Sequence, residues 1–201
     1  MSSNDATLRT YARTIQGYID RTPHVVDGAT RDWLDRTIED LPAEARIFEL
    51  GSAFGRDAAY LAQRGFVPEC SDAVPGFVEH LRGLGFDARL FNALSDSLSG
   101  PYDLILANAV MLHFTAAEFA QVATKLCRAL APHGRFAFSL KQGQGEEWST
   151  AKLGEPRFFR YWQAEELPAV LTAAGFKRWD MVAAHTGRNH ADWLYTVARP
   201  D

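Results

Sequence analysis

Apolar residues recur at helical spacing in two segments near the N-terminus. A first helix is predicted over residues 5–21, and Pro23 follows where its pattern stops. Its apolar face comprises Leu8, Tyr11, Ile15, Tyr18 and Ile19. A second helix is predicted over residues 28–41, ends just before Pro42 and has Trp33, Leu34 and Ile38 on one face.

From residue 46 onward, short apolar runs alternate with helical patterns. The runs predict strands over residues 46–50, 67–71, 88–91, 102–108 and 134–140. Helices are predicted between them, over residues 58–64, 75–83 and 116–130. This alternation is typical of βαβ units, so it predicts an α/β fold with a parallel sheet covered by helices on both faces.

The C-terminal quarter is less regular. A polar loop is predicted from Gly143 to about Trp162, followed by a helix over residues 164–174. Two apolar runs, residues 177–184 and 193–198, predict a closing hairpin. The sequence shows no internal repeat and no interdomain linker, so we expect residues 1–201 to form one domain.

Composition narrows the function classes. With 201 residues and 47% hydrophobic content, the chain can bury one sizeable core, while a net charge of -4 disfavours nucleic acid as a partner. No apolar run approaches the roughly 18 residues of a membrane-spanning helix, so a cytoplasmic protein without a membrane partner is expected. Cys70 and Cys127 lack metal-ligand spacing and are expected as reduced thiols, and no metal site is predicted. Monomer and homodimer both stay open.

Polar residues follow the predicted strands at their carboxyl ends, where open α/β sheets bind ligands. They are Glu49, Asp72, Asn92, Asn108 and Lys141. The first lies in the segment Glu49-Leu50-Gly51-Ser52-Ala53-Phe54-Gly55-Arg56, which joins a strand to a helix. Its two glycines would let the backbone approach a ligand, and the following helix would present free N–H groups.

Asp72 lies about 20 residues beyond Gly51, where an acid can accept hydrogen bonds from both ribose hydroxyls. The alternative is that Asp72 caps the helix beginning near Pro75. Asn92 offers a donor and an acceptor to an adenine edge, and Ala73, Val74 and Leu94 could sandwich the base. An adenosine-containing cofactor is therefore predicted.

Two cofactor classes use such a layout. A dinucleotide site requires glycines at the first, third and sixth positions of the turn, which here are Gly51, Ala53 and Arg56. The segment instead resembles the acid-x-Gly-x-Gly-x-Gly loop of class I S-adenosylmethionine-dependent methyltransferases, with Ala53 in place of the middle glycine. Its methyl group is compatible with such a loop if the backbone there keeps a negative φ.

The resemblance extends from about Tyr11 to the end of the chain. It includes the strand over residues 102–108 and the turn Leu130-Ala131-Pro132-His133-Gly134-Arg135. Overall the chain looks like small bacterial methyltransferases of the tellurite-resistance type, whose N-terminal helices form a lid. This implies a lid over residues 1–41 and a Rossmann-like core over residues 45–201, a three-layer sandwich around a mostly parallel seven-stranded sheet with an antiparallel last strand.

By this resemblance, S-adenosylmethionine is the cofactor and S-adenosylhomocysteine the product. Glu49 and the loop from Gly51 to Gly55 hold the methionine moiety, Asp72 the ribose and Asn92 the adenine. Asn108 lies beside the sulfonium. The cofactor site is completed by Tyr18, Ala53, Arg56, Asp57, Ala73, Ala93 and Ala109.

The sulfonium methyl group is already activated, so the protein chiefly has to align the acceptor and exclude water. In resembling enzymes a helix such as residues 5–21 closes over the cofactor, which places Tyr18 at the reaction centre and Tyr11 against the acceptor. Ordinary helix packing is the alternative for both. His113 is a candidate base for the acceptor proton, or else a histidine packed at a helix start.

Two further segments are candidates for acceptor binding. Lys141 and Trp148 flank a glycine-containing polar loop, which could equally be a solvated connection. Arg157 and Arg160 lie in the run Arg157-Phe158-Phe159-Arg160-Tyr161-Trp162, which could enclose an aromatic or charged acceptor. Arg188, Asn189 and His190 in the last hairpin turn are expected on the surface.

The sequence thus predicts a methyltransferase that modifies a small-molecule acceptor. Methylation of a tRNA or a protein side chain is the first alternative, and it predicts a basic or peptide-sized surface near Arg157 and Arg160. A module that binds S-adenosylmethionine without turnover is the second. An oxidoreductase ranks last, because the glycine pattern fails at two of three positions.

Overall fold

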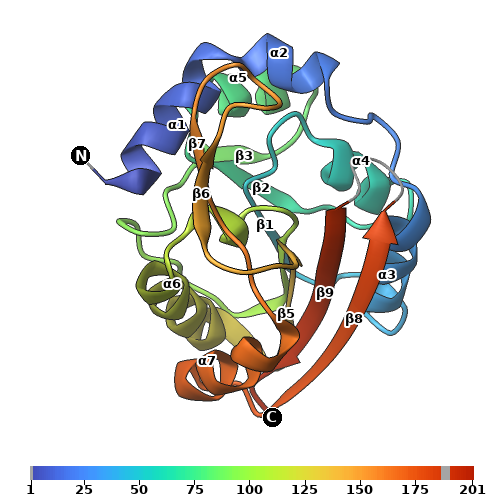
Figure 1. Ribbon diagram of the computed structural model, residues 1–201. Helices are drawn as coiled ribbons and strands as arrows, with labels where there is room; N and C mark the ends of the chain where they lie inside the picture. Colours follow the sequence, from blue (N-terminus) through green and yellow to red (C-terminus); the bar gives the residue numbers. More distant parts are fainter. Residues whose placement is uncertain (1, 187–190) are drawn as a thin grey trace.

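Seven strands form one twisted sheet in the order β3-β2-β1-β4-β5-β9-β8 (Figure 1). The computed structural model describes residues 2–186 and 191–201. β1 to β5 run parallel, whereas β9 is antiparallel to both β5 and β8. The strands are β1 (Ile47–Leu50), β2 (Glu69–Asp72), β3 (Ala88–Leu90), β4 (Tyr102–Ala107), β5 (Leu130–Lys141), β8 (Arg178–Thr186) and β9 (Ala191–Arg199). The predicted fold class is confirmed.

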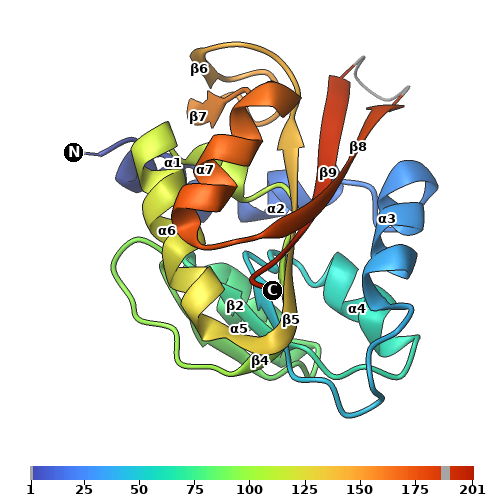
Figure 2. The same ribbon diagram turned by 90° about the horizontal axis from the view of Figure 1, so that it is seen from below.

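Helices cover both faces of this sheet (Figure 2). One face carries α3 (Gly28–Ile38), α4 (Arg56–Ala62) and α5 (Pro75–Gly83), which pack on the apolar side chains of β1 to β4 and β9. The other face carries α6 (Ala116–Ala129) and α7 (Leu167–Ala174). The result is a three-layer sandwich of helix, sheet and helix.

The chain's local sequence explains its central elements. Ile105 and its neighbours in β4 form an almost unbroken apolar run, as expected for a parallel strand buried on both faces. α6 begins with a capping box: Thr115 Oγ1 accepts from the Glu118 N–H at 3.3 Å, and the Glu118 carboxylate accepts from the Thr115 N–H at 2.8 Å. Short 3₁₀ helices lie at Met111–His113 and Ala164–Glu166.

The first predicted helix is wrong in one respect, because it is two helices. α1 (Ser3–Arg13) and α2 (Ile15–Asp20) are separated at Thr14, whose φ of -123° and ψ of 25° are not helical. The Thr14 hydroxyl donates to the Thr10 carbonyl oxygen at 2.7 Å and competes with the backbone for it. A helical apolar pattern cannot reveal such a break, since the pattern continues through it.

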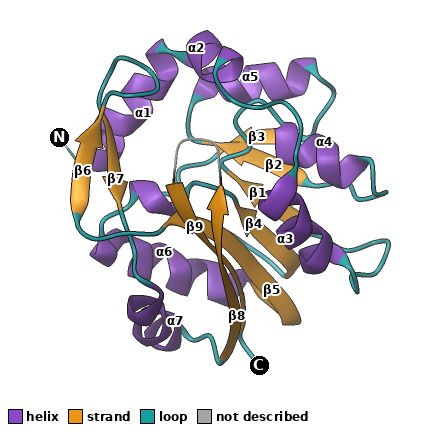
Figure 3. Cartoon of the chain, turned by 45° about the vertical axis from the view of Figure 1, so that its right-hand side comes forward, coloured by secondary structure: helices purple, strands orange, loops and turns teal. Residues whose placement is uncertain are grey.

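The predicted polar loop over residues 143–162 is also wrong, since it contains a second sheet. β6 (Glu146–Ser149) pairs antiparallel with β7 (Arg157–Arg160), beside α1 and apart from the main sheet (Figure 3). Three successive residues of β7, from Arg157 to Phe159, are buried, so the strand lacks the alternation expected of one. Its stability comes from packing against α1 instead.

Candidate functional site

Two adjoining cavities open at the carboxyl ends of the parallel strands. The first, here the Asp72 cavity, has a volume of about 90 Å³ and lies between α1 and the loops after β2, β3 and β4. The second, here the Arg56 cleft, has a volume of about 510 Å³ and extends towards β9. Five residues line both cavities: Tyr18, Gly51, Ala53, Asn108 and Ala109.

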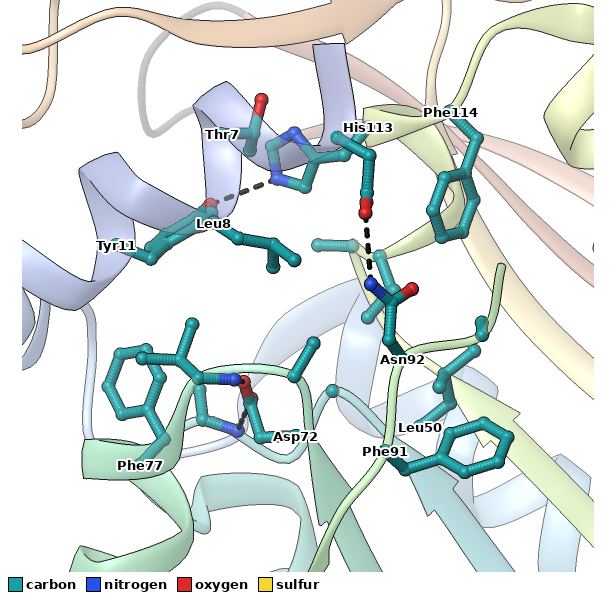
Figure 4. Close-up of a pocket in the computed structure, with 18 of the residues that line it drawn as sticks. Thr7, Leu8, Tyr11, Leu50, Asp72, Phe77, Phe91, Asn92, His113 and Phe114 are labelled. Carbon is teal, nitrogen blue, oxygen red and sulfur yellow. Dashed lines mark hydrogen bonds between the residues drawn. The ribbon is translucent and has the colours of Figure 1, made fainter. Parts of the chain in front are cut away.

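α1 covers the Asp72 cavity. Figure 4 shows Leu8 and Tyr11 facing Asp72 and Asn92 across the space. Cavities that hold a small ligand usually exceed about 300 Å³, so the Asp72 cavity is too small for an adenosine while α1 lies in this position. Asn4, Thr7 and Leu8 of α1 also line this cavity, but the predicted site did not include them. A helical pattern shows which face of a helix is apolar and not what that face covers.

Asp72 holds two loops together at the floor of this cavity. Its Oδ1 accepts from the Val74 N–H and its Oδ2 from the Ala53 N–H, both at 2.9 Å. Burial raises the pKa of Asp72 to about 6, although both backbone donors act to lower it. Val74 is the N-cap residue of α5, so Asp72 supports the start of this helix and also faces the cavity.

The glycine loop has the tight backbone that the sequence indicates. Gly51 has a φ of +70°, and a Cβ there would lie 2.5 Å from Val110 Cγ2. Gly51 lines both cavities, as expected of a residue that lets a ligand approach. Gly55 lines neither: a Cβ there would lie 3.0 Å from Leu81 Cδ2, so this glycine serves the packing of α4 against α5.

The backbone at Ala53 differs from the negative φ that the sequence analysis required. Its φ is +49°, in the left-handed region. The hydrogen bond from its N–H to Asp72 and the turn closed by the Gly55 N–H on the Ser52 carbonyl oxygen, at 2.8 Å, hold it there. Ala53 nevertheless lines both cavities.

Glu49 lies beneath the loop and lines neither cavity. It is buried, and the Cys70 thiol donates to its Oε2 at 3.7 Å. Burial, followed by the nearby charge of Asp57, raises the pKa of Glu49 to about 8. Both effects favour the protonated form of this carboxyl group.

A hydrogen-bonded chain runs along the floor of the Arg56 cleft. Arg56 Nε donates to Asp57 Oδ1 at 2.7 Å, and Asn108 Nδ2 donates to Asp57 Oδ2 at 2.7 Å. The Ser139 hydroxyl donates to Asn108 Oδ1 at 2.6 Å and accepts from the Ala109 N–H at 2.8 Å. This chain fixes the ends of β4 and β5 to the start of α4.

Asn92 faces the Asp72 cavity with its side chain already engaged. Its Nδ2 donates to Asn4 Oδ1 at 3.2 Å, and its Oδ1 accepts from the Leu94 N–H at 3.0 Å. Ala73 and Ala93 line the same cavity, whereas Leu94 does not. Apolar residues, among them Phe77 and Phe91, form most of its other walls (Figure 4).

His113 belongs to a buried network with Tyr11 and Arg157. Its Nδ1 lies 2.7 Å from the Phe158 carbonyl oxygen, which can only accept, so Nδ1 carries the proton. Nε2 then accepts from the Tyr11 hydroxyl at 2.9 Å, and that hydroxyl accepts from Arg157 Nη1 at 3.1 Å. Burial lowers the pKa of His113 to about 3, so its ring is neutral.

The remaining predicted acceptor residues are spread out. Lys141 Nζ lies 4.3 Å from the centre of the Phe159 ring. Arg160 pairs with Glu146 at 3.5 Å and with Glu166 at 2.9 Å. Trp148 is half exposed and packs edge-on against Phe158.

The two arginines in and beside β7 do not form an exposed basic surface. Arg157 is only 5% exposed and Arg160 is ion-paired. These two residues thus do not form the basic surface that was one of the two surfaces expected for a tRNA or protein acceptor. Arg188, Asn189 and His190 lie outside the described residues.

Lys152 is a residue that the sequence analysis missed. It lies in the connection between β6 and β7 and lines the Arg56 cleft. Its Nζ donates to Thr22 Oγ1 at 2.5 Å and lies 4.2 Å from the centre of the Tyr18 ring. No sequence motif marks a lone lysine in a polar loop, so only the fold reveals its position.

Residues 2–186 and 191–201 contain neither a metal-binding group of side chains nor a membrane-spanning helix. No three His, Cys, Asp or Glu side chains in these ranges are grouped so that they could hold a metal ion. No helix there has the length and apolar character needed to span a membrane.

The chain resembles known methyltransferases both in its fold and in a family of sequences. A search of curated proteins gives no match. Among solved structures, the 1,6-didemethyltoxoflavin N1-methyltransferase of Burkholderia thailandensis, with its acceptor and S-adenosylhomocysteine bound, superposes with a TM-score of 0.74 at 20% identity, covering 98% of this chain and 86% of that one.

Two further structures share the fold. The magnesium protoporphyrin IX methyltransferase of Synechocystis, with S-adenosylmethionine bound, gives a TM-score of 0.72 at 14% identity, with 99% and 98% of the two chains covered. The phosphoethanolamine N-methyltransferase 2 of Haemonchus contortus, in complex with phosphomonomethylethanolamine and S-adenosylhomocysteine, gives 0.76 at 12% identity, covering 100% of this chain and 61% of that one.

The match to a protein family is more specific than the likeness in fold. Residues 23–180 match the family described as the methyltransferase domain, which is well over half of the chain. This range includes the glycine loop, Asp72, Asn108 and His113. The chain therefore belongs to the methyltransferase domain family, with the fold of the class I S-adenosylmethionine-dependent methyltransferases.

Proposed function

We propose that this protein transfers a methyl group from S-adenosylmethionine to a small-molecule acceptor. One observation carries the proposal: Asp72, the loop at Gly51 and Asn108 come from separate strand ends and line two joined cavities. A carboxylate facing a mostly apolar cavity suits a ribose and base, and the wider cleft leaves room for an acceptor.

In this proposal the Asp72 cavity takes the adenosine, with the ribose on Asp72 and the adenine near Asn92, Ala73 and Ala93. The methionine end lies towards Gly51, Ala53 and the Arg56 cleft. S-adenosylmethionine supplies an electrophilic methyl group on a sulfonium. Because that group is already activated, the protein has to align the acceptor and exclude water.

We also propose that the N-terminal residues 1–41 act as a lid over the core of residues 45–201, as in the small bacterial tellurite-resistance type. α1 fills part of the space that an adenosine needs, so cofactor entry requires α1 to move. Tyr18 borders both cavities and Tyr11 bonds to His113, so closure of the lid would complete the reaction centre.

His113 has a restricted role in this scheme. With its pKa at about 3 and its Nδ1–H donated to the Phe158 carbonyl oxygen, it is a weak base whose one acceptor atom, Nε2, is bonded to the Tyr11 hydroxyl in this structure. We propose that Nε2 orients the acceptor's N–H or O–H in place of the Tyr11 hydroxyl. The three structural relatives support small-molecule acceptors as a class, since they are named as methyltransferases of 1,6-didemethyltoxoflavin, phosphoethanolamine and magnesium protoporphyrin IX.

Calorimetric titration with S-adenosylmethionine, S-adenosylhomocysteine and NAD tests the proposal. We expect both adenosyl ligands to bind, and Asp72→Ala to weaken their binding by about 1.5–3 kcal/mol through loss of charge-assisted hydrogen bonds to the ribose. Asp180→Ala, at an exposed carboxylate of β8, is the matched control and should leave affinity unchanged. Binding of NAD alone would overturn the proposal.

A further inference from the structure

Three cationic side chains converge on the acceptor side of the site. They come from different elements: Lys141 from the end of β5, Lys152 from the β6–β7 connection and Arg157 from β7. We name them the cation cluster. Arg157 Cζ lies 4.9 Å and Lys141 Nζ 4.3 Å from the centre of the same ring, that of Phe159.

The members of the cation cluster lie close enough to repel one another. Burial, followed by the charges of Arg157, Arg56 and Lys141, lowers the pKa of Lys152 to about 8. Burial and the charge of Arg157 likewise lower the pKa of Lys141, while Glu147 acts in the opposite direction. The charges of Lys152 and Lys141 are thus held where burial and neighbouring positive charges disfavour them.

No carboxylate of the described residues lies within ion-pair distance of the cation cluster. Arg157 is 5% exposed; its Nη1 donates to the Tyr11 hydroxyl, and its buried Nε has no hydrogen-bond partner. Lys152 donates to a hydroxyl of Thr22. Arg160 of the same small sheet, by contrast, has two carboxylate partners, Glu146 in β6 and Glu166 in the following 3₁₀ helix.

Buried cations without a counter-charge are costly, and proteins usually pair them. Arg157 is buried, Lys141 and Lys152 are partly buried, and Lys152 lines the Arg56 cleft. The cluster therefore indicates a ligand that enters this cleft and supplies the missing negative charge. An arginine suits a planar carboxylate or a phosphate, because its guanidinium presents paired donors.

The cluster belongs to the acceptor side because of the elements that carry it. Lys141, Lys152 and Arg157 all follow β4 in the chain, at the end of β5 and beyond it, whereas Asp72 and Asn92 lie on the opposite side of Gly51. Arg157 contacts Tyr11, which bonds to His113. Lys152 reaches the Arg56 cleft, which has room for an acceptor.

We propose that the cation cluster binds an anionic group, a carboxylate or a phosphate, of the methyl acceptor. This rests on the proposed function, since it assumes that the Arg56 cleft takes the acceptor. Lys152 and Arg157 bind the anionic group, and Lys141 reinforces the positive potential. The acceptor's nucleophile is then held at a fixed distance from that group, at Tyr18, where the Arg56 cleft meets the Asp72 cavity that His113 lines.

The test uses the full-length protein saturated with S-adenosylhomocysteine and three probes of similar size: benzoate, phenylphosphate and neutral benzamide. Calorimetry at pH 7 should show at least one anion binding about tenfold or more tightly than benzamide. Lys152→Gln should reduce that affinity about tenfold. Lys177→Gln, the same change at an exposed lysine, should leave it unchanged.

The absence of any preference for the anions over benzamide would overturn the inference, and so would an unchanged anion affinity in Lys152→Gln. Thermal unfolding of each variant checks that it is folded. The proposed function has a separate readout, binding of S-adenosylhomocysteine itself, so the two failures are distinguishable.

A second arm separates the acceptor from the cofactor, whose methionine end also carries a carboxylate. Lys152→Gln is titrated with S-adenosylhomocysteine and with 5′-methylthioadenosine, which lacks the amino acid. Equal affinities to wild type for both ligands support an acceptor site. Weaker binding of S-adenosylhomocysteine alone would assign the cluster to the cofactor and overturn the proposal.

Discussion

The two halves of the site are built in different ways. The half around Asp72 and the glycine loop is formed by strand ends and by the turns that directly follow them. Each of its residues is therefore only a few positions from a strand of the main sheet. The half around Arg157 is assembled from α1, α2 and the β6–β7 sheet, whose partners are far apart in the chain. The first half is set by local backbone geometry, and the second by tertiary packing.

This difference has an energetic consequence. The glycine loop is fixed by the hydrogen bond from Ala53 to Asp72, by positive φ angles and, at Gly51, by the close approach of Val110, which leaves no room for a Cβ. The attachment of α1 to β7 depends on a few side-chain contacts: the Thr7 hydroxyl accepts from the Phe158 N–H at 3.0 Å, and the Thr10 hydroxyl donates to the Pro156 carbonyl oxygen at 2.7 Å. We therefore expect the half around Arg157, here the acceptor half, to open at a lower free energy than the half around Asp72.

Gly51→Ala should produce the largest effect, because it changes the glycine loop, which belongs to the more rigid half around Asp72. The new Cβ would lie 2.5 Å from Val110 Cγ2 at a φ of +70°, so the free energy of unfolding should fall by about 2–4 kcal/mol. Denaturant unfolding measures this. Gly65→Ala has a similar φ of +88° with open space around its Cβ, and it should cost only the backbone strain. Equal losses in the two variants would show that the contact with Val110 does not matter.

Thr7→Val combined with Thr10→Val should release the acceptor half. Both hydroxyls are buried between α1 and β7, and their loss should lower the free energy of opening by about 2 kcal/mol. Hydrogen exchange should quicken at the amides of α1 and β7 and stay unchanged in β4. Thr124→Val, whose hydroxyl bonds only within α6, is the control. Uniform acceleration would instead indicate global destabilisation.

Glu49→Gln should change how stability depends on pH. The folded protein holds a proton on Glu49 up to about pH 8, whereas the unfolded chain releases it near pH 4.5, so the free energy of unfolding falls as pH rises through that window. Glutamine mimics the protonated carboxyl group. At pH 8.5 the variant should be more stable than wild type by about 1.4 kcal/mol or more in denaturant unfolding. A steeper decline with pH in the variant would contradict this.

Tyr11→Phe should have the smallest effect of the four. It leaves Nε2 of His113 and Nη1 of Arg157 without the hydroxyl that joins them, which should cost about 1 kcal/mol in the free energy of unfolding. Tyr161→Phe removes a hydroxyl bonded to exposed Glu147 and should cost less. If both variants lost the same stability, the buried network would have no special value.

Several features of the fold could be predicted from the sequence because each follows from a local rule. Apolar runs of four to seven residues between helical patterns predicted the parallel strands, and the structure confirms the α/β sheet with its antiparallel last strand. The break at Thr14 and the β6–β7 sheet could not be predicted. A hydroxyl that competes for a backbone carbonyl and a strand that buries successive residues leave the hydrophobic period unchanged.

For the site, the sequence by itself determined the residues that lie at strand ends: Gly51, Asp72 and Asn108 follow apolar runs, and parallel topology places such ends at one edge of the sheet. Only the tertiary structure decided that Ala53 adopts a φ of +49° and that α1 covers Asp72. It alone brought Lys152 to Tyr18, because contacts between distant segments depend on how whole elements pack rather than on any local pattern.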